Sequence, residues 1–384
     1  MLKDKDLETA VDAILERFEE INLYFIKQAA EQIRQIGELT QSSINRLTIM
    51  AGLRSDVKAI TSALSNAAKL STKDVQRLYR KAAEETYTDS RFTAAYVDDK
   101  PPVEAQERIE RLTQSISEQT ADAMTNISNT TAVSDAYKSA VDDAVLSVVS
   151  GLTDYKSATR RAVQRIGYSG LQVQYESGYH RRLDTALRQN IIDGANQISQ
   201  QSAKIMGEEL GYNAYEISAH ANSAPDHEPV QGHIFLLAEF EKIQSGQNFV
   251  DINGISYAGF PRKIGEWNCG HMALPFDTRY SVPSYTAEQL QEWAKLNRKG
   301  CDVDGRHYSN YEASQLMRKI EAEIRRQKDT AVAAQTAGDD VLRRNCQRKI
   351  NALSAKYLQI AKLSGLPTKR QRMTVDGFKA IKLN

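Results

Sequence analysis

Histidine, cysteine and proline are concentrated in one stretch of the 384-residue sequence, from Ser218 to Pro283. It holds His220, His227, His233, His271 and Cys269, together with Pro225, Pro229, Pro261, Pro275 and Pro283. These are four of the six histidines, one of the three cysteines and five of the eight prolines. Because proline lacks a backbone donor and restricts the residue before it, no long helix can run through this stretch. We expect a compact irregular or β module, rich in groups that bind metal or move protons, on a helical scaffold.

The sequence before this stretch has the spacing of amphipathic helices. Apolar residues spaced three and four apart stand at Leu7, Val11, Ile14, Phe18, Ile21 and Phe25. This seam lasts only about three heptads, so we favour a bundle helix over a coiled coil. We expect Ser71 or Thr72 to cap another helix, and residues 125–134 to form a loop. A long helix is predicted from His180 to Leu210, with Gly211 just beyond its end.

Inside the stretch the pattern changes to short strands. Residues 213–219 alternate like a strand, and residues 233–240 are a short apolar run. Asn253-Gly254 lies between two β-prone segments. Since both residues tolerate positive φ, the pair predicts a β-hairpin with a type I′ turn.

Helical sequence returns after Pro283. Thr286 with Gln289, and Ser309 with Glu312, have the spacing of capping boxes. Two further apolar stripes predict a helical hairpin that turns at Gly338 and is followed by a basic tail. The sequence therefore predicts a mainly α protein with a small α+β module. The expected domains are a helical scaffold (1–210), the His/Cys module (211–283) and a helical hairpin with its tail (284–384).

Charge and cysteine content narrow the functional classes. Basic and acidic residues balance at 50 and 49, so no global field indicates nucleic acid or membrane. Residues 341–384 hold eleven basic residues and one acidic residue. That segment could meet packaged nucleic acid through Lys369, Arg370 and Arg372, or an acidic protein, or it could be a solvated helix face. Three cysteines make no disulfide framework, and we expect neither a signal peptide nor a membrane span.

The His/Cys stretch contains a candidate zinc site. Zinc takes nitrogen and sulfur ligands, often as two short-spaced pairs. Here His227 and His233 are six residues apart, and Cys269 and His271 form a C-x-H pair. His220 is a spare imidazole. The alternative is that these side chains hydrogen-bond within a small polar core.

Enzymatic use of the same residues is a weaker hypothesis. Asp226 or His220 could act as base and Cys269 as nucleophile. However, the sequence has no nucleophile elbow, phosphate-binding loop or H-E-x-x-H motif. We therefore assign no catalytic and no cofactor-binding residue.

The motif residues of this stretch resemble those of the phage minor capsid protein 2 family, which is related to Mu F-like head morphogenesis proteins. The resemblance rests on His220, Pro225, His227, Gln231, Gly232, Asn268, Cys269 and His271. It covers residues 180–380 well and the helical N-terminal half in general character. Two positions differ, because Ala224 and Gly270 stand where the family usually has arginine.

This resemblance implies a structural protein of the virion, made in the host cytoplasm. It implies association with the portal or the major capsid protein at the head interior, and a role in head morphogenesis or DNA ejection. Packaged DNA is a further expected partner through the basic tail, and no membrane partner is expected. The competing hypothesis is a metal-dependent nuclease or peptidase delivered in the particle.

Overall fold

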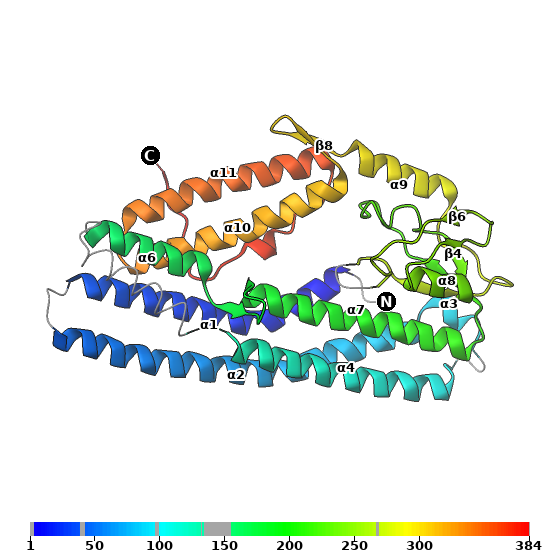
Figure 1. Cartoon of the computed structure of the whole chain (residues 1–384), viewed down its shortest axis with the longest axis horizontal. Helices are drawn as coiled ribbons and strands as arrows, with labels where there is room; N and C mark the ends of the chain where they lie inside the picture. The colour runs from blue at the N-terminus through cyan, green and yellow to red at the C-terminus, as the bar shows by residue number, and fades with distance from the viewer. Residues whose placement is uncertain are drawn as a thin grey trace. The chain divides into compact units, whose positions relative to one another are not determined.

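The computed structural model describes residues 4–38, 43–96, 100–131, 133, 155–265 and 269–383. This part of the chain is mostly helical, with small antiparallel sheets in the middle of the sequence, which confirms the predicted fold class (Figure 1). The chain forms two compact units. The first comprises Met1–Val11, Thr72–Ala121 and Gln189–Ser314, and the second comprises Asp12–Ser71, Asp122–Arg188 and Gln315–Asn384. The division into three consecutive domains stays a prediction.

Long helices make up most of the N-terminal half. They are α1 (Asp4–Glu38), α2 (Ser43–Tyr87), α4 (Val103–Asn129), α6 (Tyr155–Ser169) and α7 (Leu183–Glu209), and a single turn, α3 (Ser90–Thr93), follows α2. The predicted stripe of α1 is confirmed, since Val11, Phe18 and Phe25 are fully buried. The predicted cap at Ser71 or Thr72 is wrong, because both residues lie inside α2. Ser71 is buried and accepts a hydrogen bond from Arg17 (3.4 Å).

Two other boundaries differ from the sequence prediction. Residues 125–129 belong to α4, so the loop predicted for 125–134 starts too early, and its residues 132 and 134 lie outside the described residues. The helix predicted from His180 begins only at Leu183. The residues before it form strand β2 (His180–Arg182), which pairs antiparallel with β1 (Gln172–Gln174). Gly211 does follow α7 with a φ of 69°, as predicted.

The His/Cys module is built on a three-stranded sheet in the first unit. The strands are β3 (Ala214–Ile217), β4 (Ile234–Leu236) and β7 (Ala273–Phe276), in the order β4-β3-β7 with both pairs antiparallel. Helix α8 (Leu237–Gln244) follows β4 directly. The core beneath the sheet includes Tyr215, Ile217, Phe235, Phe249 and Ile264. These buried side chains fix where the loops between the strands begin and end.

The predicted hairpin is confirmed, but its turn type is wrong. Strand β5 (Phe249–Val250) pairs with β6 (Ser256–Tyr257). Gly254 has a φ of 80°, whereas Asn253 does not adopt positive φ. Asp251 explains the difference, because its carboxylate accepts the backbone N–H groups of Asn253 and Ile255 (2.9 and 2.8 Å). Because the Asp251 backbone N–H also donates to the Ile255 carbonyl (3.0 Å), the loop between these two residues has three residues and ends in the left-handed Gly254.

Both predicted capping boxes start helices. Thr286 caps α9 (Ala287–Lys299) by accepting the backbone N–H of Gln289 (3.2 Å). Ser309 and Glu312 bond reciprocally at the start of α10 (Asn310–Thr336). Strands β8 (Cys301–Val303) and β9 (Arg306–Tyr308) form a hairpin between these two helices.

The predicted helical hairpin is also present. Helix α10 turns at Gly338 (φ 71°) into α11 (Asp340–Ser364), and Tyr357 of α11 donates to Glu321 of α10 (2.7 Å) (Figure 1). The tail beyond α11, which includes the 3₁₀ turn Arg370–Met373, returns along the pair. Lys328 donates to the Met373 carbonyl (2.7 Å), and the backbone N–H of Ile381 donates to Gln347 (3.1 Å).

The second unit contains a buried cluster of opposite charges. Arg182 bonds to Asp329 (2.7 Å) and Asp184 (3.3 Å), and Arg325 also pairs with Asp184. Burial alone would raise the pKa of Asp184, but Arg325 and Arg182 outweigh it and hold that pKa below its ordinary value. Burial, followed by the charge of Asp184, raises the pKa of Glu19 to about 7.

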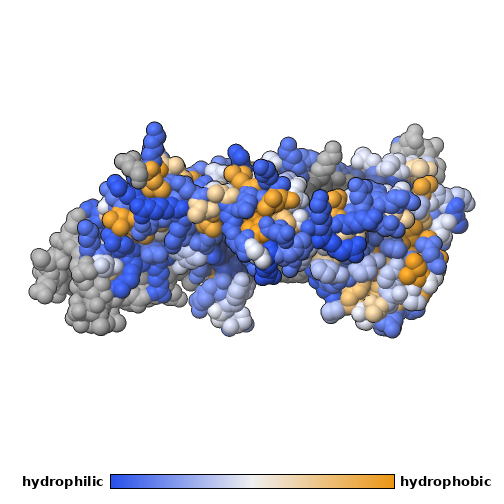
Figure 2. All heavy atoms as spheres, turned by 90° about the horizontal axis from the view of Figure 1, so that it is seen from above, coloured by the Kyte–Doolittle hydropathy of each residue, from blue (hydrophilic) through white to orange (hydrophobic). Residues whose placement is uncertain are grey.

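No helix in the described ranges has an apolar stretch sufficient to cross a bilayer. On the face drawn in Figure 2, hydrophobic residues form separate patches among hydrophilic ones.

Candidate metal centre

Two loops at one end of the sheet bring the motif residues together. One loop joins β3 to β4 and carries His227, and the other precedes β7 and carries Cys269 and His271. Gly232 closes the first loop, because its backbone N–H donates to the Ile217 carbonyl (2.7 Å). Its φ of 73° and the contact with the Leu290 side chain leave no room for a larger residue.

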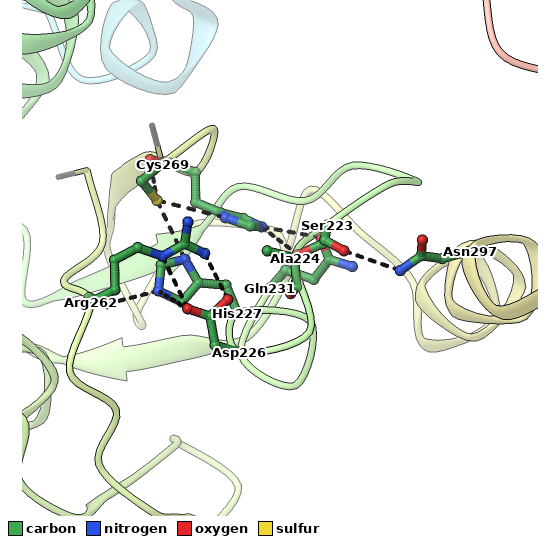
Figure 3. A network of polar contacts seen from close by, with 9 residues as sticks. Ser223, Ala224, Asp226, His227, Gln231, Arg262, Cys269 and Asn297 are labelled. Carbon is green, nitrogen blue, oxygen red and sulfur yellow. Dashed lines mark hydrogen bonds and ion pairs between the residues drawn. The ribbon is translucent and has the colours of Figure 1, made fainter. Parts of the chain in front are cut away.

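Three side chains converge at the centre of these loops. His227 Nδ1 lies 3.4 Å from Cys269 Sγ, and His271 Nδ1 lies 3.8 Å from the same sulfur (Figure 3). One possible ligand atom from each of the three residues lies within 4.8 Å of the others. His227 and His271 are buried, with 0% and 3% exposure, and Cys269 is half-buried. Two imidazole nitrogens and one thiol therefore form a group that could hold a metal ion.

The opposite nitrogen of each imidazole is fixed by an acceptor. His227 Nε2 donates to the backbone carbonyl of Arg262 (2.7 Å). His271 Nε2 lies 3.1 Å from Ser223 Oγ and 3.4 Å from Gln231 Oε1. Partners of this kind set the tautomer and the orientation of metal-binding histidines in other proteins.

Burial favours the neutral form of both imidazoles. Burial lowers the pKa of His227 from its ordinary value. Burial, with smaller contributions from His220, His227 and Arg262, lowers the pKa of His271 to about 3. A neutral imidazole is the form that binds a metal.

The structure places the other candidate residues outside this trio. His233, predicted as the fourth ligand, lies 3.1 Å from Asp251 and from the Tyr257 hydroxyl. The ring of His220 stacks on that of His271, with centroids 4.5 Å apart. Asp226 forms a two-point ion pair with Arg262. The structure thus brings together three of the four predicted ligands.

The remaining motif residues shape the first loop. Pro225 lies in a turn where the backbone N–H groups of His227 and Glu228 both donate to the Ala224 carbonyl (3.1 and 2.9 Å). Gln231 ties the loop to itself by accepting the backbone N–H of His220 (3.0 Å). Asn268 lies outside the described residues.

Sequence reasoning missed three residues in or beside this centre. Ser223 contacts His271 through its hydroxyl, and Arg262 contacts His227 through its backbone carbonyl. A backbone carbonyl leaves no mark in the sequence, because every residue has one. Asn297 of α9 was missed as well; its side chain donates to the Ser223 carbonyl (3.1 Å) and to Glu228 (2.6 Å).

The basic tail residues lie in the second unit. Arg370 is exposed. Lys369 is half-buried, and its backbone N–H donates a hydrogen bond to the Tyr357 hydroxyl (2.8 Å). Arg372 is 16% exposed in its side chain and lies 3.9 Å from Glu321. Of the three predicted cations, Arg370 is therefore the most accessible.

Fold and site together define a helical protein that carries a small module with a buried His/Cys centre. The chain belongs to the phage minor capsid protein 2 family, which matches residues 2–359. This membership implies capsid partners and suggests the virion head as the location. No curated protein and no solved structure matches the chain significantly.

Proposed function

We propose that the protein is a structural component of a phage head, attached to the portal or the major capsid protein at the head interior. It would act in head morphogenesis or in DNA ejection. The observation that carries this proposal is the family match over residues 2–359. The long helices support it, since helices of this kind gain most of their stability by packing against other surfaces.

In this role the His/Cys module is a folded knob whose loops are held together by a metal ion. A loop of the same unit offers a contact for a capsid partner. Tyr280 and Val282 are 82% and 83% exposed, although the loop is fixed at its base by Arg279 on Asp277 (2.7 Å) and by Ser284 on Glu216 (2.7 Å). Two exposed apolar side chains this close in the sequence could form part of an apolar contact with a partner.

A particle census combined with a binding assay tests this proposal. We expect the protein in mature particles and on portal-containing proheads. Replacing both Tyr280 and Val282 by Ser should weaken binding to proheads, whereas Val341→Ser, at a 51% exposed position on α11, should not. A protein that is absent from particles and does not bind proheads would overturn the proposal.

The basic C-terminal segment is proposed to contact packaged DNA. Exposed cations lie on the outer side of α11 at Arg344, Arg348 and Lys362, and continue to Arg370 in the tail. Phosphate contacts release counterions, so the affinity for DNA should fall steeply as the salt concentration rises. In a plot of log affinity against log salt concentration, each contact should contribute about −0.9 to the slope. Arg344→Gln and Arg370→Gln should each reduce the slope, while Arg372→Gln, whose side chain faces Glu321, should change it least. Salt-independent binding would contradict this contact.

The second candidate function is a metal-dependent hydrolase carried in the particle. The convergence of two imidazoles and a thiol favours it, because a bound metal could activate water. His227→Ala would then abolish hydrolysis of a nucleic acid or peptide substrate while the helical content stays unchanged. A variant that loses only its fold or its incorporation into particles would support the structural role instead.

A further inference from the structure

The buried His/Cys centre has too few protons for its hydrogen-bond acceptors. His227 Nε2 faces a backbone carbonyl, which can only accept, so Nε2 carries the proton and Nδ1 carries a lone pair. We assign the same tautomer to His271. The Ser223 hydroxyl lies 3.3 Å from the Ala224 carbonyl and 3.1 Å from His271 Nε2, and when it donates to the carbonyl, both groups near His271 Nε2, Ser223 Oγ and Gln231 Oε1, accept.

Both Nδ1 lone pairs therefore face the sulfur of Cys269. A thiol has one proton and can satisfy only one of them. The hydrogen bond to His227 Nδ1 at 3.4 Å leaves His271 Nδ1, at 3.8 Å, directed at the same sulfur without a donor between them. Because an unsatisfied buried acceptor costs about 1–3 kcal/mol, the arrangement favours a further donor or a positive group between the two nitrogens and the sulfur.

We propose that a Zn²⁺ ion is bound by His227 Nδ1, His271 Nδ1 and the Cys269 thiolate, with a fourth coordination position left open for water. The spacing fits this ion. Ligand atoms of tetrahedral zinc, with bonds of about 2.0–2.3 Å, lie roughly 3.3–3.7 Å apart. The nitrogen–sulfur separations of 3.4 and 3.8 Å already approach these values.

The types of ligand atom favour zinc over magnesium and calcium. A thiolate with two imidazoles suits Zn²⁺, whereas Mg²⁺ and Ca²⁺ need oxygen ligands. Two carboxylates of the same loop have other partners, since Asp226 pairs with Arg262 and Glu228 accepts from Asn297.

The open fourth position is proposed because, among the described residues, the metal-binding group comprises only His227, Cys269 and His271. The His220 ring is stacked face to face on His271. A ring nitrogen binds a metal in the plane of its ring, so stacking keeps the His220 lone pair out of the coordination sphere. Cys269 is the partly exposed member of the trio, and water can reach the ion from its side.

The zinc site rests on the proposed function, in which a metal ion holds the His/Cys module together. Zinc binding is measured on the purified full-length chain without particles, so that loss of metal binding and loss of head association are separate outcomes. Metal analysis after zinc loading and dialysis should give about one Zn²⁺ per chain. Cys269→Ser should hold far less zinc, whereas Cys301→Ser and Cys346→Ser, which change buried cysteines away from the centre, should hold as much as wild type.

Cobalt replacement tests the ligands and the open position without relying on stability. The Co²⁺ protein should show a thiolate-to-metal charge-transfer band that is lost in Cys269→Ser and kept in Cys346→Ser. Azide should change the Co²⁺ spectrum of wild type and of His220→Ala alike if water occupies the fourth position.

The opposite outcome is a wild-type spectrum that azide does not change and a His220→Ala spectrum that it does. That result would make His220 the fourth ligand and overturn the open position. Zinc content below about one-tenth per chain, with circular dichroism showing a folded protein, would overturn the site itself.

Discussion

The second unit buries arginines and carboxylates on helices and a strand, whereas the first unit buries imidazoles and a thiol on loops. In the second unit, Arg182 and Arg325 face Asp184 and Asp329, so two positive charges meet two negative ones. In the first, the Nδ1 atoms of two imidazoles lie 3.4 and 3.8 Å from the sulfur of one thiol. The arginine–carboxylate cluster pairs its opposite charges within the fold, whereas the His/Cys group could hold a metal ion.

The largest effect is expected at the balanced cluster. Arg182→Met removes one cation and leaves Asp329 buried without its partner, which should lower the free energy of unfolding by about 3–5 kcal/mol. Arg108→Met is the control, because its pairs with Glu208 and Glu209 are more exposed and should contribute under about 1 kcal/mol. Urea unfolding at pH 7 measures both. Equal losses would show that the buried cluster is no more important than a surface pair.

Glu19 makes the second unit sensitive to pH. Its pKa is about 7 in the folded protein against 4.5 in the unfolded chain, so between these values the folded state binds the proton more tightly. The free energy of unfolding should therefore fall as pH rises from about 4.5 to 7, by up to about 3 kcal/mol. Glu19→Gln should remove this dependence, and Glu20→Gln, at an exposed position of α1, should keep it. Parallel stability curves for wild type and Glu19→Gln would contradict the raised pKa.

A chelator distinguishes the two clusters, because only the His/Cys group is proposed to bind a metal ion. With free zinc at about 100 times its dissociation constant, binding should stabilise the first unit by about 2.7 kcal/mol, and a chelator should remove that increment. Differential scanning calorimetry with and without chelator measures it. Cys269→Ser should not respond to chelator, and Arg182→Met should respond like wild type. A chelator effect in Cys269→Ser would place the metal elsewhere.

The smallest effect is expected from the residue that orients His271. Gln231→Ala should weaken zinc binding roughly 10–100-fold, because it removes one acceptor of the Nε2 proton and leaves the ligands in place. Gln247→Ala, at an exposed position of the same module, is the matched control. Competition with a chromophoric chelator gives both affinities. Unchanged affinity in Gln231→Ala would assign the orientation of His271 to Ser223 alone.

Local features of the fold could be predicted from the sequence because their causes are local. The stripe of α1, the capping box of Ser309 with Glu312 and the turn at Gly338 each depend on residues a few positions apart. Ser71 was misread as a cap because its role is tertiary, on Arg17 of α1. The turn at Asn253-Gly254 was misread because Asp251 bonds to the turn backbone and selects a longer loop.

The candidate site was predictable in its chemistry and less so in its membership. Counting histidines and cysteines found His227, Cys269 and His271, which the structure brings together. His233 had the same spacing signal, yet it lies against Asp251, and only the fold reveals that carboxylate as its neighbour. The tautomers on which the metal inference depends are assigned from contacts with Arg262 and Ser223, and no spacing rule indicates either contact.

The strand order of the module also determines when its centre can form during folding. His227 lies between the neighbouring strands β3 and β4, whereas Cys269 and His271 are positioned only when β7 pairs with β3, which joins Ala214 to Phe276. Strand pairs between residues far apart in the sequence form late in folding, because closing the long loop between them costs conformational entropy. Metal uptake during refolding should therefore lag behind helix formation, and its rate would report the closing of the sheet.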